Sequence, residues 1–89
     1  MHDGIFRALA DPTRRRILEL LAKRDATAGE IAERFDIGFP AVSHHLAILR
    51  AANLVASTRE GQFIRYRLNT TVFQQALHYL TTILKKSKD

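Results

Sequence analysis

The chain has 89 residues, a formal net charge of +5 and no cysteine. This length predicts a single small domain over residues 1–89. Because so small a domain buries little hydrophobic core, it needs a disulfide, a metal or a second subunit to be more than marginally stable. The absence of cysteine excludes disulfides, thiolate metal sites and thiol redox sensing. No apolar run approaches the roughly 20 residues of a membrane span, so we expect a cytoplasmic protein that does not insert into membranes.

The basic excess lies in the C-terminal part of the chain. Residues 1–36 carry equal numbers of acidic and basic side chains, whereas residues 37–88 carry seven basic side chains against Glu60 alone. This asymmetry favours a polyanionic partner, either nucleic acid or an anionic membrane surface. A basic protein without such a partner also fits the same composition.

Helix signals dominate the first half of the chain. Asp11 followed by Pro12 is an N-cap with proline in the first helical turn, and Thr27 with Glu30 matches a capping box. After Asn53 the apolar period changes from 3.6 to 2, which predicts a β-hairpin. In chain order we predict helices over 3–10, 12–23, about 28–35 and 40–52, strands over 54–59 and 63–68, a last helix over 71–84 and a frayed tail over 85–89.

The third and fourth predicted helices form a helix-turn-helix. Val42, Leu46 and Leu49 recur at helical spacing and predict the buried side of the fourth helix. In a helix-turn-helix the second helix enters the major groove and presents its N-terminal side chains to base edges. We therefore expect DNA recognition by the start of this helix.

The outward face of the fourth helix carries two polar side chains near its start. At 100° per residue, Ser43 and His44 point away from the core, Ala41 lies on a flank and His45 lies at the core edge. Serine and histidine can both hydrogen-bond to bases, so we predict that Ser43 and His44 read the sequence. For His45 both a phosphate contact and a packed structural role are open.

The two adjacent histidines predict neither a metal site nor an enzyme. His44 and His45 point about 100° apart on a helix, so they cannot hold one ion from a single chain. Ser43 and His44 fail as a nucleophile and base for the same reason, and no carboxylate is placed to orient the imidazole. We expect no cofactor.

The predicted hairpin supplies cations beside the helix-turn-helix. Arg59, Gln62 and Arg65 lie near its tip, where they can contact the DNA backbone or reach into a minor groove. A solvated basic strand face is the alternative interpretation.

Three segments with their joint spacing resemble one known family. Residues 6–18 read FRALADPTRRRIL, residues 27–32 read TAGEIA and residues 42–46 read VSHHL. Together they are similar to the ArsR-type winged-helix repressors. The segment from Gly61 to Val72 resembles in particular their SdpR-like, metal-independent autorepressor branch. The resemblance implies a mainly α winged helix-turn-helix with a small β-hairpin, in the order α-α-α-α-β-β-α.

The resemblance also implies a homodimer with the first and last helices at the interface, bound to an inverted-repeat operator. The sequence supports a dimer independently, because the apolar band of the last helix is wider than a small core can cover. The expected function is a repressor, acting on its own promoter. The expected interface residues are Ile5, Phe6, Leu9, Phe73, Leu77, Leu80, Ile83 and Leu84.

The chain departs from the metal-sensing members of this family. Where thiol-type sensors carry a cysteine pair, it has Thr27 and Gly29, and where zinc-type sensors carry their ligands, it has Thr70, Val72, Ile83 and Lys86. We therefore expect no metal or thiol sensor. A sensor of a small ligand and a protein–protein anti-regulator are the alternative functions, and an unidentified protein or small-molecule inducer is a possible further partner.

Overall fold

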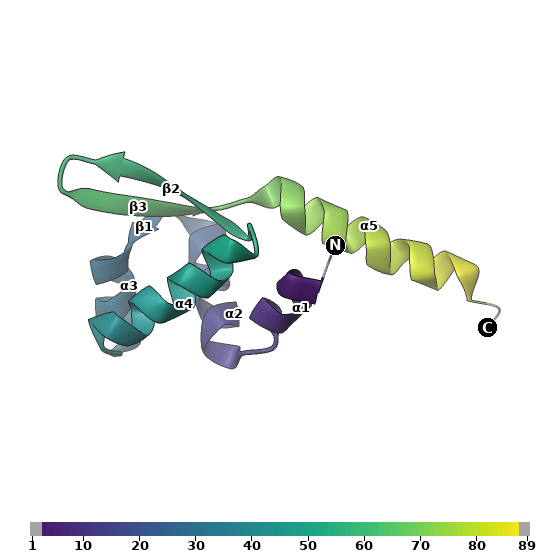
Figure 1. Ribbon diagram of the computed structural model, residues 1–89, viewed down its shortest axis with the longest axis horizontal. Helices are drawn as coiled ribbons and strands as arrows, with labels where there is room; N and C mark the ends of the chain where they lie inside the picture. Colours follow the sequence, from purple (N-terminus) through teal and green to yellow (C-terminus); the bar gives the residue numbers. More distant parts are fainter. Residues whose placement is uncertain (1–2, 88–89) are drawn as a thin grey trace.

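The computed structural model describes residues 3–87 of the chain. Within that range the protein forms five helices and three strands (Figure 1). These elements are α1 (Asp3–Leu9), α2 (Pro12–Lys23), β1 (Ala26–Thr27), α3 (Ala28–Phe35), α4 (Phe39–Ala51), β2 (Val55–Glu60), β3 (Phe63–Leu68) and α5 (Thr70–Lys86). The expected winged-helix order is confirmed, with one short strand added between α2 and α3.

The caps predicted from the sequence mark where α2 and α3 begin. Asp11 accepts a hydrogen bond at Oδ2 from the backbone N–H of Arg14, at 2.9 Å. Thr27 accepts at Oγ1 from the N–H of Glu30, and Glu30 accepts at Oε1 from the N–H of Thr27. Each cap satisfies donors that a helix start would otherwise leave unpaired.

A third strand, which the sequence pattern did not predict, widens the hairpin into a sheet. β1 pairs antiparallel with β3, so the strand order is β1-β3-β2. In this register Ala26 lies opposite Tyr66, and Thr27 lies opposite Arg65. Two residues are too few to show an alternating pattern, and periodicity therefore could not reveal this strand.

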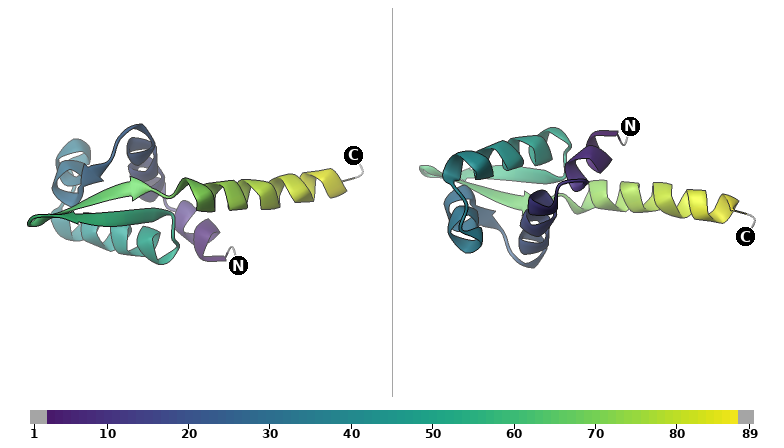
Figure 2. Two further views of the ribbon diagram at one scale, coloured as in Figure 1. Left: turned by 90° about the horizontal axis from the view of Figure 1, so that it is seen from above. Right: turned by 90° about the horizontal axis from the view of Figure 1, so that it is seen from below.

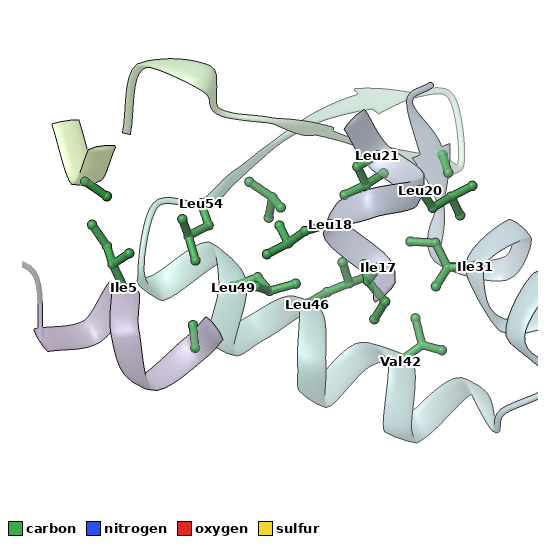
Figure 3. Close-up of a cluster of buried hydrophobic side chains, with 14 residues drawn as sticks. Ile5, Ile17, Leu18, Leu20, Leu21, Ile31, Val42, Leu46, Leu49 and Leu54 are labelled. Carbon is green, nitrogen blue, oxygen red and sulfur yellow. The ribbon is translucent and has the colours of Figure 1, made fainter. Parts of the chain in front are cut away.

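One hydrophobic core joins the helices to the sheet (Figure 3). α4 contributes Val42, Leu46 and Leu49, none of them more than 2% exposed, which confirms the predicted stripe. Burial of each such side chain stabilises the fold by about 1.5–3 kcal/mol. α2 contributes four further members, Ile17, Leu18, Leu20 and Leu21. α4 is thus fixed along its inner side and its outer side is left to solvent.

α5 projects from the rest of the molecule (Figures 1 and 2). The principal dimensions are 51 × 23 × 21 Å, and Ala76 is the buried residue of this helix. Contrary to expectation, Lys85 and Lys86 are helical, in keeping with the preference for cations at a helix C-terminus. Residues 88 and 89 of the predicted tail lie outside the described range. The other predicted boundaries differ by at most one residue from those observed.

Over residues 3–87 no helix combines the length and the apolar character that a membrane span requires.

Candidate nucleic-acid interface

The turn between α3 and α4 places the second helix of the helix-turn-helix. Asp36 ends α3 in the left-handed conformation, with φ 53° and ψ 47°. A short polar side chain tolerates this conformation better than most residues do. Gly38 then acts as N-cap of α4, and Pro40 occupies its first turn as predicted.

The start of α4 presents an exposed face. Ser43 and His44 are exposed, as the angular spacing predicts, and Ala41, which was expected on a flank, is exposed as well. His45 is only partly accessible. Because the buried stripe of the same helix is anchored in the core, this face has a fixed orientation. Two hydrogen-bonding side chains therefore stand together on a rigid solvent-facing surface.

His45 lies in a polar cluster with the start of α2. Its Nδ1 is 3.4 Å from Nη1 of Arg14 and 3.9 Å from Oδ2 of Asp11. A guanidinium can only donate, so in a hydrogen bond with Arg14 the Nδ1 of a neutral imidazole is the acceptor. Arg14 also donates through Nε to the carbonyl of Ala8 at 2.8 Å and through Nη2 to that of Arg7 at 3.2 Å. The cluster thus links α1, α2 and α4.

The rings of His44 and His45 are neighbours and are tilted against each other. Their centroids are 5.9 Å from each other and the ring planes are inclined by 55°. Among residues 3–87 no three His, Asp or Glu side chains are grouped so that they could hold a metal ion.

The hairpin of β2 and β3 forms the second part of the candidate interface. Gly61 makes the turn with φ +63°, a left-handed conformation that favours glycine. Glu60 and Phe63 pair on either side of the turn. Arg59 and Gln62 are exposed at this tip. The tip therefore carries one cation and one amide that solvent can reach.

Arg65, in contrast, contacts two carboxylates. Its Nε donates to Oε1 of Glu60 at 2.9 Å, and its Nη1 lies 3.5 Å from Oε1 of Glu30. The hydrogen bond and the charge of Glu60 raise the pKa of Arg65. The pKa of Glu30 is lowered, first by the backbone N–H of Thr27 and then by Arg65. Sequence reasoning missed the pair of Arg65 with Glu30 because Glu30 is distant along the chain.

A groove between the wing and the helix-turn-helix was also not predicted. Phe39, Phe63 and Ile64 are 56%, 61% and 41% exposed there, although all three are large and apolar. Along β3, Phe63 lies on the same side as Arg65 and Arg67. A large apolar side chain on this basic side was the one signal in the sequence for the groove. The groove has a volume of about 400 Å³ and is lined by Thr27, Ala28, Gly29, Phe39, Ser43, Gln62, Phe63, Ile64 and Tyr66. It brings Ser43 of α4 and Gln62 of the wing to one side of the molecule.

The residues expected at a subunit interface fall into two groups. Ile5 is 6% exposed within its own chain, and Leu9 and Phe73 pack against the same core. The remaining five are between 36% and 73% exposed, and they are Phe6, Leu77, Leu80, Ile83 and Leu84. The rings of Phe6 and Tyr79, with centroids 6.1 Å apart, place α1 beside α5. An interface with a second copy would therefore use the exposed group.

The fold and this surface define a winged-helix DNA-binding protein. α4 has the exposed N-terminal face of a recognition helix, and the hairpin beside it is the wing. The family profile described as "Bacterial regulatory protein, arsR family" matches residues 11–57. The chain belongs to this family of transcriptional regulators and is not an enzyme.

Individual relatives match over nearly the whole chain. The transcriptional repressor SdpR of Bacillus subtilis is 49% identical over 84 residues, covering 94% of this chain and 93% of SdpR. Among solved structures, an ArsR-like transcriptional regulator from Rhodococcus sp. RHA1 has a TM-score of 0.87 at 34% identity, covering 93% of this chain and 78% of the regulator. NolR from Sinorhizobium fredii has a TM-score of 0.74 at 35% identity, covering 90% and 80%. The resemblance to the ArsR-type, SdpR-like regulators is thus confirmed.

Proposed function

We propose that the chain acts in the cytoplasm as a homodimeric repressor of an inverted-repeat operator in double-stranded DNA, including the promoter of its own gene. The observation that carries the proposal is the exposed polar start of α4 beside a wing that bears cations, on a chain of net charge +5. SdpR, which is similar over 93% of its length, is named a transcriptional repressor, and this supports repression as the output. Response to a metal or a thiol is not part of the proposal.

The start of α4 supplies base recognition in this proposal. Ser43 and His44 hydrogen-bond to base edges in the major groove, and Ala41 packs against the groove wall or a thymine methyl group. His45 donates from Nε2 to a phosphate while its Nδ1 remains on Arg14. The exposure of the first three residues and the orientation of His45 support these roles.

The wing supplies affinity that is independent of sequence. Arg59 and Gln62 at the tip contact the backbone or enter the minor groove, whereas the charge of Arg65 is engaged by Glu60 and Glu30. The exposure of the tip supports this placement.

The exposed apolar side chains of α1 and α5 cover each other in a dimer with two-fold symmetry. Such a dimer places its two recognition helices about 34 Å apart, which is one turn of the duplex. The apolar stripe of α5 supports this arrangement, since Leu77, Leu80 and Leu84 are 64%, 45% and 73% exposed in one copy.

A salt titration tests the proposal. Fluorescence anisotropy compares a duplex from the region upstream of the protein's own gene with a mixed-sequence duplex of equal length. We expect the upstream duplex to bind tighter by about 10³-fold or more, and log affinity to fall linearly with log salt for both. Equal affinity for the two duplexes contradicts sequence recognition. Absence of salt-dependent binding to either favours a protein–protein anti-regulator, and release by added metabolites identifies a small-ligand sensor.

A further inference from the structure

We propose that Arg65 is a positioning residue: together with Glu30 and Glu60 it holds the wing against α3 and thereby sets where the wing meets DNA. The proposal rests on the proposed DNA binding and refines it. It gives two carboxylates a supporting role at a surface that binds a polyanion.

Three elements meet at the guanidinium of Arg65 on β3. Glu60, the last residue of β2, accepts from Nε at 2.9 Å. Glu30, in the first turn of α3, lies 3.5 Å from Nη1. The guanidinium is a rigid planar fork, so two carboxylates on different nitrogens fix its orientation as well as its position.

Backbone pairing extends this connection to the helix-turn-helix. Arg65 lies opposite Thr27 of β1 and Thr58 of β2. Thr27 is also the N-cap of α3, and its N–H donates at 2.8 Å to the same Oε1 of Glu30 that faces Arg65. One carboxylate oxygen therefore serves both the helix cap and the wing cation. The wing is thus tied to the helix that leads into the turn before α4.

The ion pairs are exposed, and their importance is geometric. The side chains of Arg65, Glu30 and Glu60 are 35%, 44% and 52% exposed. Exposed pairs contribute little to the free energy of unfolding, so their loss leaves the fold intact. It removes the side-chain contact that fixes the wing against α3, while the backbone pairing of β1 with β3 remains. The contact that the wing makes beside the recognition helix then becomes less favourable, because ordering a mobile segment on binding costs conformational entropy.

The positioning role predicts that loss of Glu30 changes the affinity for DNA in the opposite direction from simple electrostatics. Removing a carboxylate near DNA normally strengthens binding, because it removes repulsion from phosphates. If Arg65 were only a phosphate contact, loss of Glu30 would also free it for DNA. If Arg65 positions the wing, loss of Glu30 weakens binding despite the gain in positive charge.

Matched variants separate the two roles. Glu30→Gln removes the charge but keeps an oxygen to accept from the N–H of Thr27. Glu33→Gln is the control, since Glu33 is exposed on the same helix and takes part in none of the ion pairs found among residues 3–87. Arg65→Gln removes the shared cation. Anisotropy over a salt series, on the upstream duplex and on the mixed-sequence duplex, measures DNA binding.

We expect Glu30→Gln and Arg65→Gln each to weaken binding to the upstream duplex by about three- to tenfold relative to Glu33→Gln, and the double variant to lose little more than either single variant. The salt slope of Arg65→Gln stays close to that of the parent chain. Binding by Glu30→Gln as tight as that of Glu33→Gln, or a salt slope of Arg65→Gln lowered by about one, overturns the proposal.

A second measurement needs no DNA. Backbone ¹⁵N relaxation of the full chain reports nanosecond motion of the wing tip, residues 59–64. We expect Glu30→Gln and Arg65→Gln to raise this motion and Glu33→Gln to leave it unchanged. Identical relaxation in all three overturns the positioning role. Failure of the parent chain to bind either duplex would instead refute the proposed function, and the two results are therefore distinguishable.

Discussion

Two neighbouring histidines show how angular position on a helix separates an exposed side chain from a packed one. His44 is exposed at the start of α4, whereas the side chain of His45 is 17% exposed and contacts Arg14 and Asp11. Successive residues of a helix point about 100° apart. One residue can therefore face solvent while the next contacts a neighbouring helix. Substitution of His44 therefore probes the exposed start of α4, away from the contacts that His45 makes with Arg14 and Asp11.

We expect His44→Ala to reduce the discrimination between the upstream and the mixed-sequence duplex by about 1–3 kcal/mol, the worth of a good base contact. Its free energy of unfolding should change by less than about 0.5 kcal/mol, because the side chain is exposed. Anisotropy and urea unfolding measure the two quantities, with Gln74→Ala on α5 as an exposed control. An equal loss on both duplexes contradicts base reading by His44.

Arg59 is expected to behave differently from His44, because a phosphate contact carries no sequence information. Arg59→Ala should weaken binding to both duplexes by similar factors and lower the salt slope by about one. Arg16→Ala, which removes an exposed cation from α2, serves as the control for net charge. An unchanged salt slope for Arg59→Ala excludes a phosphate contact at this wing position.

At the scale of single elements, low pH is expected to weaken the helix caps at the starts of α2 and α3, because both caps depend on an ionised carboxylate. The pKa of Asp11 is lowered chiefly by the backbone N–H of Arg14, and the pKa of Glu30 chiefly by that of Thr27. A carboxyl whose pKa is lower in the folded state stabilises the fold above its unfolded pKa. That stabilisation is lost as the pH falls through the folded pKa.

The free energy of unfolding should therefore decrease as the pH is lowered from the ordinary carboxyl values of 4.5 for Glu30 and 3.8 for Asp11. Urea unfolding at a series of pH values measures this acid limb. A double variant, Asp11→Asn with Glu30→Gln, keeps cap acceptors that do not titrate and should show a shallower limb. The same acid dependence in the variant and the parent chain would show that the caps do not cause it.

The wing turn depends on one backbone conformation. Gly61 has φ +63°, and a Cβ there would meet no other atom within 4 Å. Gly61→Ala should thus cost about 1–2 kcal/mol through the left-handed backbone alone. Gly61→Asn, which tolerates this conformation better, should cost less. Urea unfolding compares the two, and an equal loss points to a cause other than backbone conformation.

The parts of the fold that could be predicted are those whose signals lie within a few residues. Asp11 with Pro12, and Thr27 with Glu30, locate two helix starts locally, and the stripe of α4 gives its inner and outer sides. The contact of Glu30 with Arg65 joins segments that only the sheet register brings together, and no local pattern encodes it.

At the scale of the whole molecule, the main feature is the apolar surface that α5 exposes to solvent. α5 extends away from the other elements (Figure 2). It turns apolar side chains to solvent along one side, while its buried residue is Ala76. Contiguous exposed apolar surface on a soluble protein marks an interaction site. The polar side of the same helix carries Gln74 and Gln75. A second copy related by two-fold symmetry can cover the apolar side and leave the polar side in water.

Leu80→Glu tests this arrangement directly. Leu80 is 45% exposed on the stripe of α5 and lies outside the core, so the substitution leaves the fold of the single chain intact. We expect the dimer to dissociate, because a two-fold interface would bury two uncompensated carboxylates. Sedimentation equilibrium measures the mass, and affinity for the upstream duplex should fall to that of a single half-site contact. Gln75→Glu places the same charge on the polar side and should remain dimeric. A Leu80→Glu variant that stays dimeric and binds like the parent chain excludes this face of α5 from the interface.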